Sequence, residues 1–371
     1  MDVAVLAGGR SPEHDISLSS TAEVLRHLDR SRWRVWPVFL DRDGGWWPSA
    51  RPLPPGAAWQ PRIGAVHGRA MRPGSALGWL LDQGIAVVLP VLHGPHGEDG
   101  TVQGMLELHD VPCVGSGCAA SAVAMDKIRT RQALQSAGIP LARAYEPSGP
   151  FAAAGAPAEF ARMRAAVGLP AFVKVDASGS TFGVQRIESE EQLATFLGEF
   201  RGRFRRWFAE SEVRGEEITV AVLGNTGGPL QALPPVGIYP QCDGWFTHEA
   251  KYRPGASEEI VPPRGLSQQQ IDHVQDLAVR CHETLVCDGM SRTDMIVTPN
   301  GPVVLEVNTL PGLTQTSLLP KAAAAAGLSF SALLDRLLAL ALERRNGTVG
   351  ESARGGADRR TTLDGGASIS A

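Results

Sequence analysis

The sequence lacks the features of a membrane, secreted or nucleic-acid-binding protein. Its longest apolar run, from Ile85 to Leu92, is far shorter than the roughly 20 residues of a membrane-spanning helix. Its five cysteines are odd in number and widely scattered, which fits neither a disulfide framework nor a zinc site. A net charge of −4 gives no basic excess for nucleic acid or an anionic membrane. We therefore expect a cytoplasmic protein with reduced thiols.

Two common nucleotide-binding motifs are also missing. The sequence contains no GxxxxGK[ST], which argues against a Walker-type loop, and no GxGxxG, which argues against a dinucleotide oxidoreductase. It contains no internal repeats either. What is present is an ordinary globular composition over 371 residues, 43% hydrophobic and 20% charged, long enough for two or three domains.

The stretch from Ser291 to Pro311 carries the clearest local pattern. Two apolar runs flank the turn sequence TPNG at residues 298–301, and Asn-Gly between such runs is typical of a β-hairpin. Closing this hairpin brings Asp294 to within about one residue of Glu306. Because side chains alternate along a strand, Glu306 and Asn308 share one face. The pattern thus predicts two carboxylates and one amide oxygen at the mouth of the hairpin.

These oxygen donors predict a site for a hard divalent cation such as Mg²⁺, and not for zinc. Glu306 lies inside the apolar sequence VVLEV, where an unpaired buried charge is costly and a cation would relieve the cost. Arg292 lies two residues before Asp294 and can project on the same side. The alternative is that both carboxylates flank a surface hairpin, since Asp and Glu are mostly exposed.

Polar residues also follow two predicted strands near the N-terminus. The first strand runs into Ala7-Gly8-Gly9, and the buried strand that ends at Leu92 runs into HGPHGEDG, which begins with His93. Open α/β sheets bind ligands at the carboxyl ends of their strands. The alternatives are a plain tight turn at the glycines and a capping or core histidine. Residues 1–116 are expected to form a small βαβ-type domain.

Two lysines in the middle of the chain could contact phosphate. We expect one long helix over residues 119–137, which contains Lys127, and a strand that carries Lys174 before a Gly/Ser-rich loop. Lysine charge with backbone and hydroxyl donors suits a phosphate clamp, although a surface loop is favoured for this segment alone. From residue 346 the polar, Gly-rich composition predicts a disordered tail, 346–371.

Taken in order, eight sequence blocks resemble the D-alanine–D-alanine ligases of the ATP-grasp superfamily. They are AGGRSPEHDIS, LHGPHGEDGTVQG, GSG with SAVAMDK, FVKVDASGSTFG, GEEITVAVLG, HEAKY, SRTD and EVNTLPGLTQTSLLP, spread over nearly all of residues 1–343. The resemblance implies an α/β (α+β ATP-grasp) fold, with an N-terminal parallel-sheet domain at 1–116. A central ATP-grasp lobe at 117–213 and a C-terminal lobe with the metal hairpin at 214–345 would follow.

The resemblance also implies a role for each matching position. For ATP, Lys127, Lys174 and Lys251 would contact phosphates, Glu210, Ser211 and Val213 would form the adenine hinge, and Glu217 would bond the ribose. For metal, Asp294, Glu306 and Asn308 would hold two Mg²⁺ or Mn²⁺ ions. For the reaction, Arg292 and the Gly312 backbone would stabilise the tetrahedral intermediate, and Ser180 and Tyr252 would close a loop over the site. For the amino acids, Asp15 and His93 would anchor the first D-alanine, and Ser317 and Leu318 would bind the carboxylate of the second.

The implied reaction is ATP-dependent ligation of two D-alanines through D-alanyl phosphate, by a cytoplasmic homodimer that supplies peptidoglycan precursor synthesis. Asp15 departs from the family pattern, where Glu is frequent, as do Val175, where Pro is usual, and Ser211, where Lys often contacts adenine. Tyr252 is retained and is associated with D-alanine as second substrate. The alternatives are a related ligase using D-lactate, D-serine or another amino acid, and a nucleotide-binding regulator without the chemistry. The three metal-ligand positions argue against the regulator.

Overall fold

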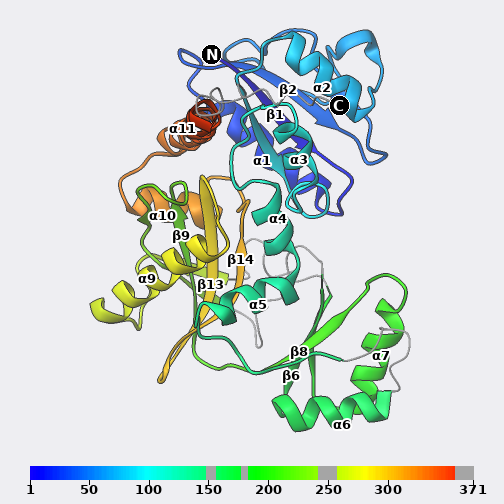
Figure 1. The fold of residues 1–371 in the computed structure, drawn as a ribbon, viewed down its shortest axis with the longest axis vertical. Coiled ribbons are helices and arrows are strands. Elements are labelled where there is room, and N and C mark those ends of the chain that lie inside the picture. Colours follow the sequence, from blue (N-terminus) through cyan, green and yellow to red (C-terminus); the bar gives the residue numbers. More distant parts are fainter. Residues whose placement is uncertain (148–155, 177–182, 241–256, 356–371) are drawn as a thin grey trace, which may run out of the picture.

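The computed structural model describes residues 1–147, 156–176, 183–240 and 257–355, and shows three units, each built around its own sheet (Figure 1). The N-terminal unit lies at one end of the molecule and the central lobe at the other, with the C-terminal lobe between them. The combination of helices with one mostly parallel sheet and two antiparallel sheets confirms the predicted fold class.

The N-terminal domain has a four-stranded sheet in the order β3-β2-β1-β4. The strands β1 (Asp2–Gly8), β2 (Arg34–Leu40) and β4 (Val87–Leu92) are parallel, and β3 (Trp46–Pro48) is an antiparallel edge. Its helices are α1 (His14–His27), α2 (Pro73–Asp82) and α3 (Thr101–Glu107), with a 3₁₀ turn at Val66–Gly68. Beyond these strands, Cys113 forms an isolated parallel bridge with Val88 of β4.

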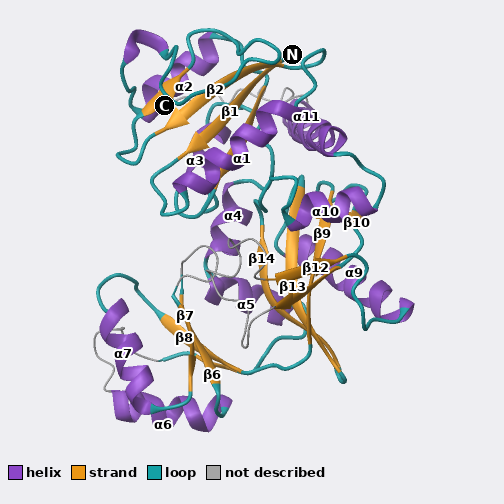
Figure 2. Cartoon of the chain, turned by 180° about the vertical axis from the view of Figure 1, so that it is seen from behind, coloured by secondary structure: helices purple, strands orange, loops and turns teal. Residues whose placement is uncertain are grey.

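The central lobe is an antiparallel sheet with its own core. Its strands are β5 (Ala144–Tyr145), β8 (Trp207–Ser211), β6 (Ala171–Val175) and β7 (Val184–Ile187), in that spatial order. Helices α6 (Ala156–Val167) and α7 (Glu190–Phe200) lie along one side of the sheet (Figure 2). Met163, Val173 and Phe196 pack between the helices and the sheet and are fully buried. The lobe therefore has a hydrophobic core that is separate from the cores of the other two units.

The helix that connects the first two units is broken, which differs from the expected structure. One helix was predicted over residues 119–137, but the structure has α4 (Cys118–Met125) and α5 (Lys127–Ser136). Asp126 is extended at the break, and its carboxylate accepts hydrogen bonds from the amides of Ile128 (3.1 Å) and Arg129 (3.0 Å). This N-cap satisfies amides that a new helix leaves free, so Lys127 becomes the first residue of α5.

The C-terminal lobe has an antiparallel sheet in the order β12-β11-β9-β13-β14, with β10 also paired to β9. The strands are β9 (Glu216–Leu223), β10 (Gln231–Ala232), β11 (Val236–Pro240), β12 (Ser257–Ile260), β13 (Met290–Thr298) and β14 (Gly301–Asn308). Its helices are α9 (Gln268–Thr284), α10 (Leu318–Ala325) and α11 (Phe330–Gly355). Helix α11 thus runs past residue 346 to Gly355, where a disordered tail was predicted, and residues 356–371 lie outside the described part.

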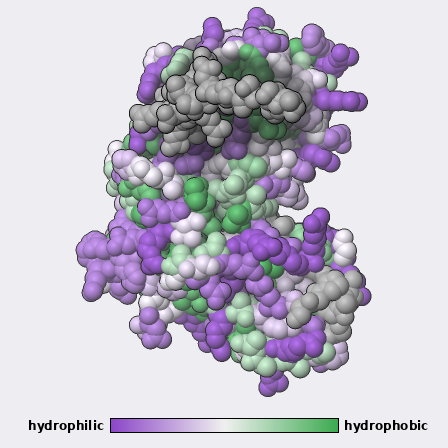
Figure 3. Space-filling view, viewed as in Figure 1, coloured by the Kyte–Doolittle hydropathy of each residue, from purple (hydrophilic) through white to green (hydrophobic). Residues whose placement is uncertain are grey.

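One hydrophobic core joins the N-terminal domain to the C-terminal lobe. Val5 of β1, Leu223 of β9 and Leu337 of α11 belong to a single buried cluster. Of the helices described, none is by itself long and apolar enough to cross a membrane; α10 and the first part of α11 meet that test only as a pair bent by 104°. The face drawn in Figure 3 is mostly hydrophilic, with its apolar residues in small groups.

Candidate active site

The β13–β14 hairpin holds the carboxylates as the sequence predicted. Asp294 is paired directly with Glu306, and Arg292 with Asn308. The turn closes with Thr298 opposite Gly301, whose φ of +115° suits glycine. A register shift follows Asp294, so the strand is irregular just beyond the pair. The hairpin prediction is confirmed.

Arg292 and Asp294 form a buried bidentate pair. Arg292 Nε and Nη2 each donate a 2.8 Å hydrogen bond to one carboxylate oxygen, and Thr219 Oγ1 donates a third of 2.6 Å. Burial lowers the pKa of the Arg292 guanidinium, but the charges of Asp294, Glu306 and Glu98 and the hydrogen bonds outweigh this and raise it. The arginine therefore stays charged and fixed in direction.

The oxygen donors here suit a hard cation. Three carboxylates, Asp294, Glu306 and Glu98, act on the guanidinium of Arg292, so acidic groups outnumber it. The amide oxygen of Asn308 lies on the same rim and accepts a 2.8 Å hydrogen bond from the Leu310 amide, which orients it. Carboxylate and amide oxygens are ligands that Mg²⁺ accepts, so the residues present fit such an ion.

A cavity of about 270 Å³ opens beside the hairpin. Nine of the predicted site residues line it, namely His93, Glu217, Arg292, Asp294, Glu306, Asn308, Gly312, Ser317 and Leu318. Glu217, which the resemblance assigns to the ribose of ATP, therefore lines this cavity. Ser317 is the N-cap residue of α10, and its hydroxyl accepts from the Thr314 amide at 3.2 Å, so the loop that carries Gly312 is tied to the helix start.

The entry to α1 differs from the prediction. The structure places Glu13, and not Asp15, on the cavity wall. Helix α1 begins at His14, and Glu13 is buried just before it. The side chain of Asp15 is 81% exposed and forms a 2.9 Å ion pair with Arg42 on the outside of the domain. Asp15 therefore cannot touch a substrate in this cavity, and Glu13 can.

His93 and Glu98 approach the cavity from the carboxyl end of β4. His93 Nδ1 lies 3.5 Å from a Glu98 carboxylate oxygen. The buried His93 Nε2 has no hydrogen-bond partner among the described residues, and such an atom is costly unless a ligand or water satisfies it. His93 was predicted as a substrate residue. Glu98 was missed, although it lies in the HGPHGEDG segment that the sequence had singled out.

A second cavity lies between the central lobe and the hairpin. Lys127, Arg131 and Phe208 line one wall, and Leu305 and Glu306 line the other. The residues common to the two cavities are Glu98, Glu306 and Asn308. The two spaces therefore meet at the oxygen donors of the hairpin, which is the arrangement needed for transfer between two bound molecules.

A buried charge cluster lies behind the wall of the second cavity, and Arg131 is its member that lines the cavity. The carboxylate of Glu210, 3% exposed, binds Arg131 through one oxygen and Lys174 through the other. Arg131 also donates a 2.7 Å hydrogen bond to the Ala142 carbonyl. Two cations to one carboxylate leave this cluster with a net positive charge, which favours an anion beside it. Glu98 and Glu306, which also line the cavity, carry the opposite charge. Arg131 was missed because its partner lies far away in the sequence.

The remaining predicted site residues lie either outside both cavity linings or outside the described part of the chain. Ser211 ends β8 and donates a 2.9 Å backbone bond to Arg143; it and Val213 lie outside the lining of the second cavity formed by the described residues. Ser180, Lys251 and Tyr252 lie outside the described residues. Their predicted roles stay predictions.

Comparison with known proteins agrees with this geometry. Family models for the N-terminus and the C-terminus of D-ala D-ala ligase match residues 2–116 and 120–339. A D-alanine–D-alanine ligase from Syntrophobacter fumaroxidans is 40% identical over 344 residues, 92% of this chain and 98% of that protein.

Two solved structures extend the likeness to the fold. The D-alanine–D-alanine ligase from Bacillus anthracis complexed with ATP is 27% identical, with a TM-score of 0.71 over 94% of this chain and 99% of that one. The VanG D-Ala:D-Ser ligase from Enterococcus faecalis is 29% identical, with a TM-score of 0.73 over 92% and 99%. With both halves matched, the chain belongs to the D-alanine–D-alanine ligase family.

Proposed function

We propose that the protein joins two D-alanine molecules at the expense of ATP, giving D-alanyl-D-alanine, ADP and phosphate. The observation that carries this proposal is the meeting of the two cavities at Glu98, Glu306 and Asn308. Nucleotide would occupy the cavity beside Lys127, and amino acids the cavity beside Arg292. The phosphoryl donor and its acceptor would then lie next to each other at one rim.

In the first step a carboxylate oxygen of one D-alanine attacks the γ-phosphorus of ATP. The bond from that phosphorus to the β–γ bridging oxygen breaks, so ADP leaves and D-alanyl phosphate forms. Two anions must approach, and the Arg131–Glu210–Lys174 cluster and Lys127 supply positive charge on the nucleotide side. Glu13 and His93, which line the other cavity, would hold the amino acid there.

In the second step the amine of another D-alanine attacks the acyl carbon. An oxyanion develops there, then phosphate leaves and the amine loses a proton. Arg292 lines this cavity, and its pairing with Asp294 favours the charged guanidinium, so it is suited to stabilise that oxyanion. Ser317 and Leu318, at the start of α10, would receive the carboxylate of this second amino acid, because helix amides favour anions.

Asp294, Glu306 and Asn308 would hold Mg²⁺ or Mn²⁺ during the reaction. The ions would neutralise charge on the phosphates, which the lysines alone neutralise only in part. The protein orients two of these oxygen ligands: Thr219 and Arg292 hold the Asp294 carboxylate, and the Leu310 amide holds the Asn308 oxygen.

The decisive experiment is the mass of the product. Purified protein is incubated with ATP, Mg²⁺ and D-alanine, then with D-alanine plus D-serine or D-lactate. We expect D-alanyl-D-alanine and stoichiometric ADP, both abolished by excess EDTA. A mixed product in the absence of D-alanyl-D-alanine would instead favour the second-substrate alternative, which the likeness to a D-Ala:D-Ser ligase keeps open. We also propose that the protein acts in the cytoplasm as a homodimer and supplies peptidoglycan precursor synthesis. Light scattering of the purified protein tests whether it is a dimer.

A further inference from the structure

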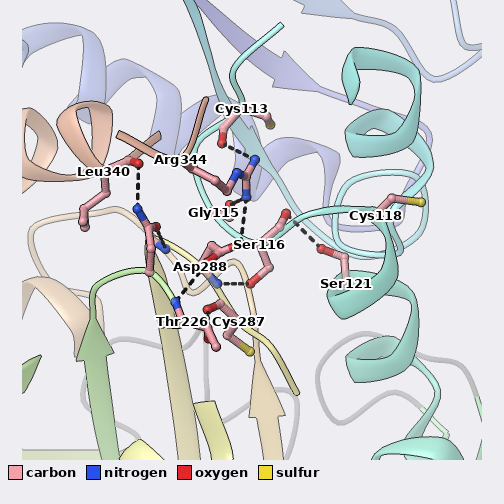
Figure 4. A network of polar contacts seen from close by, with 12 residues as sticks. Cys113, Gly115, Ser116, Cys118, Ser121, Thr226, Cys287, Asp288, Leu340 and Arg344 are labelled. Carbon is pink, nitrogen blue, oxygen red and sulfur yellow. Dashed lines mark hydrogen bonds and ion pairs between the residues drawn. The ribbon is translucent and has the colours of Figure 1, made fainter. Parts of the chain in front are cut away.

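Helix α11 is fastened to the N-terminal domain at two points. Near its start, Asp335 accepts 2.6 Å hydrogen bonds from Arg32 and from the buried Trp33 indole. Nine residues later, about 14 Å along the helix, Arg344 Nη1 donates to the Gly115 carbonyl at 2.8 Å and Nη2 to the Cys113 carbonyl at 3.2 Å (Figure 4). These carbonyls end the segment that leaves the N-terminal sheet.

Arg344 also reaches the C-terminal lobe. Its Nη1 lies 3.3 Å from Asp288 Oδ2, and the other oxygen of Asp288 accepts from the Thr226 amide at 3.1 Å. The Asp288 amide donates back to Ser116 Oγ at 3.2 Å (Figure 4). One guanidinium therefore binds the last residues of the first domain and an acidic loop of the third unit at the same time.

A close backbone approach lies beside this network. A Cβ added to Gly289 would meet the Gly115 nitrogen at 3.1 Å, and Gly289 has a φ of +70°. Asn225 Oδ1 accepts from the Gly289 amide at 3.0 Å, while Asn225 Nδ2 donates to the Leu340 carbonyl of α11 at 2.9 Å. The N-terminal domain, the C-terminal lobe and α11 thus touch through backbone groups at this point. The close approach leaves little space for one unit to shift against another.

The position of this junction matters for the amino-acid cavity. That cavity takes Glu13 and His93 from the N-terminal domain, and Arg292 and Asp294 from the C-terminal lobe. Its width depends on how the two units sit against each other. The nucleotide cavity draws instead on α4, α5, β8 and β14, and Glu98 is its contribution from the N-terminal domain.

We propose that Arg344 is a positioning residue that holds the N-terminal domain on the C-terminal lobe, and so sets the two walls of the amino-acid cavity at their working separation. The proposal rests on the ligase function above. Arg344 itself lines neither cavity, and its planar guanidinium uses two nitrogens in a fixed arrangement to contact two carbonyls and a carboxylate at once.

The test is the kinetics of Arg344→Met in the full-length protein. We expect the KM for D-alanine to rise roughly tenfold, because small misplacements of a wall cost much affinity, while the KM for ATP stays within about twofold. The matched control is Arg336→Met on the same helix, whose exposed guanidinium pairs only with Glu343 among the described residues, at 3.3 Å. If Arg344 only stabilised the fold, Arg344→Met would lower the melting temperature without raising the KM for D-alanine more than the KM for ATP.

A second variant guards against a folding defect. Asp288→Asn keeps the size of the side chain and weakens the contact with Arg344, and we expect the same direction of change with a smaller size. Wild-type protein that makes no D-alanyl-D-alanine would refute the proposed function. The positioning role alone would be refuted if the wild type is active and the KM for D-alanine is the same in Arg344→Met, Asp288→Asn and Arg336→Met.

Discussion

Asp294 and Glu306 occupy directly opposed positions on β13 and β14; both line the cavity beside Arg292, and Glu306 also lines the cavity beside Lys127. Asp294 receives three hydrogen bonds from protein donors, two of them from Arg292. Its orientation is therefore fixed before any ligand arrives, which removes part of the ordering cost of binding.

The first prediction concerns Asp294→Asn. The amide cannot accept both Arg292 bonds and is a weaker metal ligand, so we expect kcat to fall roughly 100-fold, as for loss of a preorganised charged group. Circular dichroism should still show a folded protein. ADP release measures the rate, and Asp272→Asn on the exposed face of α9 is the control. Unchanged turnover would argue against a metal role for Asp294.

The second prediction separates Glu13 from Asp15. Glu13→Gln removes a buried charge from the cavity wall, and we expect the KM for D-alanine to rise roughly 10-fold or more, since a hydrogen bond to a charged group contributes about 1.5–3 kcal/mol. Asp15→Asn, two residues along, should change it less than about twofold, because an exposed ion pair contributes little. A larger rise in the KM for D-alanine with Asp15→Asn than with Glu13→Gln would contradict the position of Glu13 on the cavity wall.

The sequence predicted the hairpin well because that structure is local. Turn residues, alternation and register all lie between Ser291 and Pro311, and the observed pairing of Asp294 with Glu306 follows from them. The residue chosen at the start of α1 was wrong for the opposite reason. Whether Glu13 or Asp15 faces the site depends on where the helix begins and how it packs on the sheet, which neither residue's local sequence encodes.

Distant contacts account for the other differences. The break at Asp126 occurs where the Lys127 amide donates a 2.9 Å hydrogen bond to the carbonyl of Asp176, the residue after β6 in the central lobe. Helical periodicity alone runs straight through this point, since Ala and Met favour helix on its N-terminal side. The binding of Glu210 to Arg131 likewise joins segments that approach only after folding.

The third prediction tests that break. Asp126→Ala removes the N-cap of α5, and we expect the free energy of unfolding to fall by about 1 kcal/mol. The KM for ATP should rise as well, because Lys127 follows the cap directly and lines the nucleotide cavity. Urea unfolding and ATP titrations measure the two effects. Asp126→Asn, which retains a capping oxygen, should preserve most of the stability.

The last prediction concerns His282, a fully buried residue of α9 whose Nδ1 lies 2.8 Å from Ser291 Oγ. Burial lowers the pKa of His282 to about 4, although backbone hydrogen bonds act the other way. In the unfolded chain the pKa is about 6.5. Between these values the unfolded state binds more protons, so the free energy of unfolding falls as the pH drops from about 6.5 to about 4.

This loss amounts to at most about 3 kcal/mol for His282. The loss of unfolding free energy is absent at pH values above the pKa of His282 in the unfolded chain. It is complete at pH values below the pKa of His282 in the folded protein. Urea unfolding between about pH 4.5 and 7.5 should show a shallower pH dependence for His282→Asn than for the wild type. His273→Asn, an exposed histidine on the same helix, is the control and should keep the wild-type slope. Equal slopes for His282→Asn and the wild type would mean that other groups set the acid sensitivity of the fold.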